Sequence, residues 1–284
     1  MNTTNSDTPS HAGDYVLGTR EDERHRLEFQ HRVWLADAQR GWHAAGVAPG
    51  ARVLDLGCGP GLATASMLEI VGPAGRVDGL DRSAEFVAQA RARCGSAGRG
   101  DADVRQMNLV DEDVPTDMRG RYDVAWCRWL AMFVPQPERV IAAASAALRV
   151  GGRLVMHEYV DYSTYALHPR GGRVREFVAL AIESFARDGG DAHIGRRLPA
   201  MLTAAGFTID ALRPMARAAR PFEELWHWPA GFIRVYAPKL VEMGLADATW
   251  LENLLAEVDG AETRPGAFFT APLLFEIVAT KTLE

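Results

Sequence analysis

Two acidic residues and a run of glycines in the first third of the chain have the types and spacing that a nucleoside-binding site needs. An apolar segment ends with Asp55 and is followed by Gly57, Gly59 and Gly61. Glycine lacks a Cβ atom, so such a turn can take strained backbone angles and let a ligand lie against the main chain. Asp81 ends a second apolar segment about 20 residues past the turn, where a carboxylate can accept hydrogen bonds from ribose hydroxyls. The spacing therefore predicts a β-α-β unit that binds a nucleoside.

The residues of the turn also indicate which nucleoside suits it. A dinucleotide fingerprint would need a third glycine at position 62, which is Leu62 in this chain. A pyrophosphate is disfavoured as well, because Asp55 would repel the anion that a helix N-terminus attracts. The acidic turn instead favours a ligand that carries positive charge.

The alternating glycines after Asp55, with Asp81 downstream, resemble motif I and its following acid in class I S-adenosylmethionine-dependent methyltransferases. S-adenosylmethionine carries a sulfonium and an ammonium, so the charge argument and the resemblance agree. The small-molecule type of ubiquinone and menaquinone biosynthesis is the one that the chain resembles. The resemblance is specific over roughly Ala51 to Glu158 and covers the remainder only by strand order.

The resemblance implies a residue set for the cofactor S-adenosylmethionine, whose product is S-adenosylhomocysteine. It places the glycine turn beneath the methionine and ribose, Asp55 near the amino-acid part and Asp81 on the ribose. The other positions it implies are Tyr15, Gln30, Cys58, Arg82, Asn108, Leu109, Cys127 and Arg128. Three of them have simpler readings: Tyr15 as a surface anchor rather than a cation–π partner, Asn108 as a turn residue and Cys127 as a small packing residue.

Asn108 departs from the family pattern, which usually has Asp at this position for the adenine amino group. Its side-chain carbonyl is still a hydrogen-bond acceptor, so the same contact can form.

The composition excludes several classes of protein. The chain has 284 residues, a hydrophobic fraction of 48% and a formal net charge of -6. No run approaches the roughly 18 apolar residues of a membrane span, the N-terminus lacks an apolar signal core, and the charge disfavours nonspecific nucleic-acid binding. Cys58, Cys94 and Cys127 are widely spaced, so we expect no metal, no disulfide framework and a cytoplasmic protein.

Strand-like and helix-like segments alternate from 51 to 158, which predicts a doubly wound α/β fold. The strands we expect there are 52–56, 76–80, 104–108, 122–127 and 152–158. Helices are expected at 61–71, 83–93 and 138–148, the last stopped by Gly151 and Gly152. Further strands are expected near 207–212 and at 273–280. The resemblance implies that the last of the seven strands is reversed and inserted beside the sixth.

The organisation around this core is predicted from composition and helical periodicity. A polar tail at 1–14 precedes an N-terminal helical cap at 15–50, and the cofactor-binding core spans 51–158. A helical insertion follows at 159–200, and 201–284 completes the sheet with a second helical lid insertion at about 213–269.

The chemistry is predicted from residues near the end of the fifth strand. A phenol or alcohol acceptor would need a general base, and histidine is the side chain best suited near neutral pH. His157 is the candidate; it shares a strand face with Tyr159, whereas Glu158 points to the other face. The alternative is that His157 is a hydrogen-bonded structural residue. His193 and His227, in the two insertions, are weaker candidates.

Aromatic residues predict an apolar pocket for the acceptor, although such stripes usually belong to the core. The substrate-binding candidates are Trp129, Tyr159, Tyr162, Trp226, Phe232 and Tyr236.

The function that we expect is methyl transfer to an O or N atom, less readily C, of a small aromatic or apolar molecule, in secondary metabolism, by a monomer or homodimer. A protein of the same fold that binds S-adenosylmethionine without methyl transfer, as a rearrangement catalyst or binding protein, is the alternative. A nucleotide-dependent oxidoreductase is disfavoured by Leu62.

Overall fold

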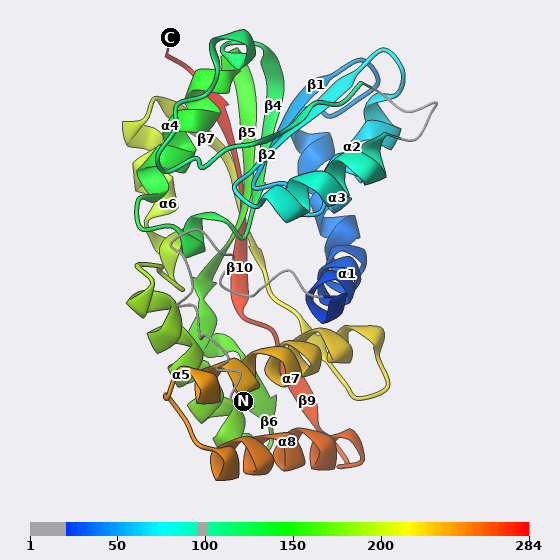
Figure 1. The fold of residues 1–284 in the computed structure, drawn as a ribbon, viewed down its shortest axis with the longest axis vertical. Coiled ribbons are helices and arrows are strands. Elements are labelled where there is room, and N and C mark those ends of the chain that lie inside the picture. The colour runs from blue at the N-terminus through cyan, green and yellow to red at the C-terminus, as the bar shows by residue number, and fades with distance from the viewer. Residues whose placement is uncertain (1–20, 96–100, 284) are drawn as a thin grey trace, which may run out of the picture.

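A seven-stranded sheet forms the centre of the computed structural model, which describes residues 21–95 and 101–283. Its strands are β1 (Arg52–Leu56), β2 (Arg76–Asp81), β3 (Val104–Gln106), β4 (Tyr122–Arg128), β5 (Leu148–Asp161), β7 (Phe207–Met215) and β10 (Leu273–Lys281). They lie in the order β3-β2-β1-β4-β5-β10-β7 (Figure 1). The first five pair in parallel, and β10 is antiparallel to both β5 and β7. The predicted doubly wound fold with a reversed last strand is confirmed.

Helices cover both faces of this sheet. The helices on one side are α1 (Glu21–Ala45), α2 (Leu62–Val71) and α3 (Ala84–Cys94), and those on the other are α4 (Pro137–Ala147) and α6 (Leu198–Ala204) (Figure 1). The central strand β1 is buried from Val53 to Leu56, as expected for a parallel strand with both faces covered. Ser83 caps α3, because its Oγ accepts a hydrogen bond from the Phe86 N–H at 3.2 Å.

The N-terminal helix packs on the sheet by its aromatic face, as its periodicity predicts. Trp34, Ala38 and Trp42 of α1 have no exposed surface, and the Trp42 and Trp126 rings meet edge-on at 5.4 Å. The expected tail at 1–14 lies outside the described residues. Among the helices in the described ranges, none has both the length and the apolar character to cross a bilayer.

Several predicted boundaries differ from the structure, among them the start of β5 and the end of β3. The helix α4 ends at Ala147, and Leu148 already belongs to β5, where it pairs with Tyr122. Gly151 and Gly152 lie within β5, next to a register shift between β4 and β5, so these glycines serve a bulge rather than a helix stop. The third strand is also shorter than predicted and ends at Gln106, which leaves Asn108 in the turn that follows.

The two insertions form a second lobe that contains strands as well as helices. Its helices are α5 (Gly172–Arg187), α7 (His227–Glu242) and α8 (Ala248–Glu262), and its strands are β6 (Ala166–His168), β8 (Ala218–Ala219) and β9 (Phe268–Thr270). The strands pair in the order β6-β9-β8 and so join both insertions (Figure 1). The predicted helical insertions therefore contain short strands as well, which were not predicted because strands of two or three residues carry no readable periodicity.

Short 3-10 helices complete the described elements and shape the loops at the strand ends. They are η1 (Thr116–Met118), η2 (Ala131–Phe133), η3 (Tyr162–Thr164), η4 (Ile194–Arg196) and η5 (Glu224–Trp226). Of these, η2 and η3 follow the carboxyl ends of β4 and β5, which is the edge where an open α/β sheet binds its ligands.

Candidate functional site

The glycine turn between β1 and α2 has the backbone that its sequence predicts. Gly57, Gly59 and Gly61 have φ angles of 70°, 54° and 78°, a region where other residues are strained. A Cβ atom on Gly61 would lie 2.8 Å from the Ala90 Cα, whereas one on Gly59 would meet no protein atom within 4 Å. Gly61 therefore allows α3 to approach the turn, and Gly59 leaves an open surface for a ligand.

Asp81, at the end of β2, is hydrogen-bonded to the turn as well as facing the open space. Its Oδ2 accepts from the Gly59 N–H and its Oδ1 from the Ser83 N–H, both at 2.8 Å. Burial raises the pKa of this carboxyl, against the effect of the two N–H donors. Each ionised carboxylate oxygen has a second lone pair, so Asp81 can still accept hydrogen bonds from a ligand.

Asp55 supplies a second carboxylate, which is almost fully buried. The Thr64 hydroxyl donates to its Oδ2 at 2.7 Å. Burial raises the pKa of Asp55 to about 6, and the hydrogen bond from Thr64 and the charge of Arg128 oppose this rise. Because a nearby positive charge favours the ionised form, the pocket is suited to a cationic ligand.

Arg128, at the end of β4, is a half-buried cation with spare hydrogen-bonding capacity. Its guanidinium lies 4.9 Å from the ring centre of Trp129 and 3.2 Å from Nδ1 of His31. Burial lowers its pKa to about 10, opposed by the charge of Asp55. Its Nη1 is buried and has no partner among the described residues. An unpaired buried donor is costly, so this atom favours an anionic or carbonyl group in the pocket.

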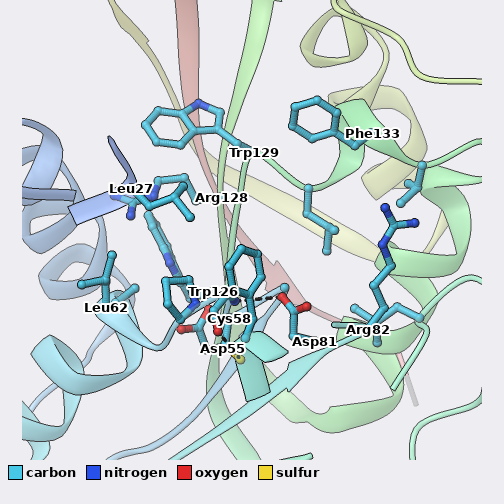
Figure 2. A pocket seen from close by; sticks show the side chains of 18 of the residues that line it. Leu27, Asp55, Cys58, Leu62, Asp81, Arg82, Trp126, Arg128, Trp129 and Phe133 are labelled. Carbon is cyan, nitrogen blue, oxygen red and sulfur yellow. Dashed lines mark hydrogen bonds between the residues drawn. The ribbon is translucent and has the colours of Figure 1, made fainter. Parts of the chain in front are cut away.

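Gly57, Gly59, Asp55, Asp81 and Arg128 line one pocket at the carboxyl ends of β1, β2 and β4, called the polar pocket below (Figure 2), whereas Gly61 does not line it. Its empty space is ≈ 1080 Å³ with the open mouth included. In Figure 2 the carboxylates of Asp55 and Asp81 lie on one side and Trp129 and Phe133 on the other. Most of the cofactor candidates are in this lining, namely Gln30, Asp55, Gly57, Cys58, Gly59, Asp81, Arg82, Asn108, Leu109 and Arg128.

A second pocket, called the aromatic pocket below, adjoins the first. Three residues line both pockets, namely Gln30, Trp129 and Phe133. The empty space of the aromatic pocket is ≈ 490 Å³. Its lining is mainly aromatic, with Arg26 and Gln30 as polar members, and includes Met132, Tyr159, Tyr162, Tyr165, Phe185, Trp228 and Phe232. Such a cavity suits a flat or apolar molecule.

Trp129 stands at the junction of the two pockets. Its ring is stacked with that of Tyr159 at 6.0 Å and with that of Trp228 at 6.1 Å. Of the acceptor-site candidates, Trp129, Tyr159, Tyr162 and Phe232 line the aromatic pocket, whereas Trp226 and Tyr236 line neither. Trp226 packs against Phe269 in the core, and the Tyr236 hydroxyl shares a 2.8 Å hydrogen bond with Ser184.

His157 does not lie beside the proposed acceptor site, where its position near the end of the fifth strand suggested a general base. It has no exposed surface and lines neither pocket. Its Nε2 lies 3.0 Å from Oε2 of Glu276, and its ring meets Trp126 edge-on at 4.7 Å. Burial lowers its pKa, so the imidazole is neutral and donates to the carboxylate. The prediction of a base is corrected, because a base must reach the proton that it removes.

The other two histidine candidates are also placed away from the polar pocket. The Nδ1 of His193 accepts from the Tyr162 N–H at 3.4 Å, and His227 packs edge-on against Phe29 at 6.4 Å. Neither lines either pocket.

Three further candidates differ from the rest of the predicted cofactor set. Cys127 is fully buried and lines neither pocket, so its carry-over to the cofactor site is corrected to a packing role. Asn108 faces the polar pocket, but its Nδ2 donates to Asp111 and its Oδ1 accepts from the Val110 N–H. Tyr15 lies outside the described residues.

One pocket contact and two pocket residues had no signal in the sequence. Gln30, itself a predicted cofactor residue, accepts a 3.0 Å hydrogen bond from Nε1 of Trp228, which joins α1 to α7 across the junction. Leu27 and Phe86 complete the polar pocket from α1 and α3. A contact between residues so far apart follows from tertiary packing, which a single sequence does not reveal.

Comparison with known proteins finds a family match over about a third of the chain. Residues 53–152 match the model of the methyltransferase domain family. An uncharacterized 37.1 kDa protein in transposon TN4556 of Streptomyces fradiae is 30% identical over 239 residues, which is 82% of this chain and 64% of that protein. The ubiquinone biosynthesis O-methyltransferase of Xanthomonas axonopodis pv. citri is 34% identical over 107 residues, covering 38% of this chain and 42% of the enzyme. The chain thus spans less than two thirds of either relative.

A solved structure gives the same fold. The geranyl diphosphate C-methyltransferase from Streptomyces coelicolor A3(2), solved with S-adenosyl-L-homocysteine, superposes with a TM-score of 0.51 at 16% identity, over 96% of this chain and 88% of that enzyme.

Proposed function

We propose that the protein transfers a methyl group to a small molecule. The premise is that residues 53–152 form a class I S-adenosylmethionine-dependent methyltransferase domain. The acceptor atom is an O or N atom, less readily C, of an aromatic or apolar compound. The observation that carries the proposal is the junction of two unlike pockets at Trp129. One pocket is lined by two carboxylates and two arginines, and the other is lined mainly by aromatic rings.

The polar pocket fits S-adenosylmethionine by its chemistry. Asp81 would accept from the ribose hydroxyls, since each of its oxygens uses one lone pair on a backbone N–H. Arg82, Asn108 and Leu109 would border the adenine. Gly59 leaves open space where a side chain would otherwise stand.

The methionine end would lie toward Asp55 and Arg128, where the two charges match it. The ionised Asp55 would favour the positive groups, and the unpartnered Nη1 of Arg128 would donate to the carboxylate. When bound, S-adenosylmethionine supplies a methyl group that is activated by the sulfonium charge, and S-adenosylhomocysteine is the product.

The aromatic pocket is the proposed acceptor site. Trp129, Tyr159, Tyr162 and Phe232 would orient a flat molecule by ring contacts and exclude water from it. Exclusion of water and fixed orientation both favour a displacement reaction. No imidazole or carboxylate lines this pocket in the described part of the chain, which favours an acceptor that is already nucleophilic at neutral pH.

The helices around the pockets are proposed to act as a cover. α1 contributes Leu27 and Gln30 to the linings, and α7 contributes Trp228 and Phe232.

We further propose that the protein works in the cytoplasm, in secondary metabolism, as a monomer or homodimer. Its three cysteines are free and buried, which agrees with a reducing compartment.

Release of S-adenosylhomocysteine tests this function. The purified protein would be incubated with S-adenosylmethionine and a panel of phenols, naphthols and aromatic amines, and the nucleoside product would be measured by mass spectrometry. We expect product to form with at least one acceptor and the methylated compound to appear in equal amount. S-adenosylmethionine binding without any product across such panels would favour the alternative of a protein that binds the nucleoside but transfers no methyl group.

A further inference from the structure

The turn after β4 has an unusual backbone at Trp129. Its φ is 52°, and it is the one non-glycine residue with a positive φ among those that the structure describes. The next residue, Leu130, has φ -111° and ψ -46°. Left-handed followed by right-handed backbone turns successive N–H groups toward one point, which forms an anion-binding nest.

Glu158 of β5 occupies this nest. Its Oε1 accepts hydrogen bonds from the Leu130 N–H at 2.8 Å and from the Ala131 N–H at 2.7 Å. The side chain has no exposed surface, and its Oε2 has no partner in the described ranges. Burial of a carboxyl is costly unless donors satisfy it, so the two N–H groups hold Glu158 and Glu158 holds the turn.

The turn that Glu158 holds places the indole of Trp129 between the two pockets. Trp129 lies in both linings, with Tyr159 and Trp228 stacked on it and Arg128 close to its ring. A bulky residue with positive φ is strained and persists only where its surroundings impose this backbone. The nest around Glu158 is such a constraint, because its two hydrogen bonds require this backbone.

We propose that Glu158 is a positioning residue, which fixes Trp129 as the wall between the polar and aromatic pockets by clamping the backbone of the turn. Glu158 itself touches neither pocket. The functional meaning rests on the proposed methyl transfer, since the wall then sets how donor and acceptor face each other. The clamp is a separate claim about the backbone and can be tested alone.

The clamp is tested by amide hydrogen exchange of the full chain. In Glu158→Leu both acceptor bonds are lost, so the Leu130 and Ala131 amides should exchange about tenfold faster or more. Glu158→Gln retains an acceptor oxygen and should stay near the wild-type rates. The control is Glu257→Leu, because Glu257 also accepts a backbone N–H, from Val174 at 2.9 Å, but in the second lobe. Unchanged exchange at 130 and 131 in Glu158→Leu, or the same acceleration in the control, would overturn the proposal.

Glu158→Asp serves where Glu158→Leu does not fold. It keeps the carboxyl group but is one methylene shorter, so it should also release both amides, and normal protection in this variant would contradict the clamp.

The wall is tested by the affinity for S-adenosylhomocysteine in a double-mutant cycle. Glu158→Leu should weaken binding by roughly threefold or more, and this loss should disappear in a Trp129→Gly background, where no indole remains to be positioned. An equal loss in both backgrounds would refute the coupling. If the wild-type protein does not bind S-adenosylhomocysteine, the proposed function fails, and the exchange rates still decide on the clamp.

Discussion

The Asp81 carboxylate and the Gly59 backbone are joined by a 2.8 Å hydrogen bond. The bond runs from the N–H in the middle of the glycine turn to the acid at the end of the neighbouring strand, 22 residues further on. Asp81 therefore has two functions: it holds the turn in place and presents its remaining lone pairs to the polar pocket. Loss of this side chain should disturb both the shape of the pocket and its chemistry.

Replacement of Asp81 by Ala should weaken S-adenosylmethionine binding by roughly 1–3 kcal/mol, because a charged acceptor for the ribose hydroxyls is lost. The matched control is Asp123→Ala. Asp123 also accepts a backbone N–H, from Arg52 at 2.9 Å, but it does not line the polar pocket. Calorimetric titration of both folded variants should show weaker S-adenosylmethionine binding in Asp81→Ala alone. An equal loss of affinity in both variants would show that the loss comes from general destabilisation.

Gly59→Val should abolish measurable binding, because a side chain there would enter the open space above the turn. A β-branched residue at a φ of 54° also costs roughly 1–3 kcal/mol of stability, which requires a control for strain. Gly120→Val provides it, since Gly120 has a φ of 64°, open space around its Cβ position and no place in either pocket. Thermal unfolding should fall in both variants, and normal S-adenosylmethionine affinity in Gly59→Val would contradict the placement of the ligand.

The affinity for S-adenosylmethionine should fall as the pH drops below about 6. Burial raises the pKa of Asp55 to about 6 in the free protein, and a cationic ligand favours the ionised carboxylate. Binding then requires loss of a proton at lower pH, so affinity should decrease by up to about tenfold per pH unit in that range. Asp55→Asn should bind less tightly at pH 7.5 and lose most of this pH dependence. An affinity that is constant between pH 5 and 7.5 would exclude the role of Asp55.

His157→Ala should affect stability much more than turnover. His157 lies in the core and donates to Glu276, so removing it leaves a buried acceptor unpaired, at a cost of roughly 1–3 kcal/mol. Burial lowers the pKa of His157, which means that the folded protein binds fewer protons than the unfolded chain. Stability is therefore lost as the pH falls through the ordinary histidine range near 6.5. Urea unfolding at pH 5 and 8 measures both effects.

The competing interpretation of His157 makes the opposite prediction. A general base would lower turnover by about 10²–10⁴ when removed, so a stable His157→Ala variant with such a loss would restore the catalytic role.

The sequence predicted the parts of the fold and site that depend on local chemistry. The bounds of β1 agree at both ends, because a fully buried parallel strand between turn residues is readable from its apolar run. Gly57, Gly59 and Asp81 lie together in one pocket, since the ends of adjacent parallel strands meet at one edge of the sheet.

The parts of the fold and site that the sequence did not predict depend on contacts between residues that are far apart in the sequence. His157 was placed on the correct strand face, but its depth in the sheet depends on Glu276, which arrives with β10 from the end of the chain. The strands β6, β8 and β9 are too short to be read before they pair. The stacking of Trp228 on Trp129 likewise required the second insertion to be folded.

Calorimetric titration of the wild-type protein with S-adenosylmethionine, paired with an identical titration with NAD, tests the central claim most directly. Running both at two temperatures guards against a binding enthalpy near zero. The account predicts saturable binding of S-adenosylmethionine at one site per chain, which S-adenosylhomocysteine displaces, and no saturable binding of NAD. Binding of NAD at that site, or no binding of S-adenosylmethionine at either temperature, would contradict it.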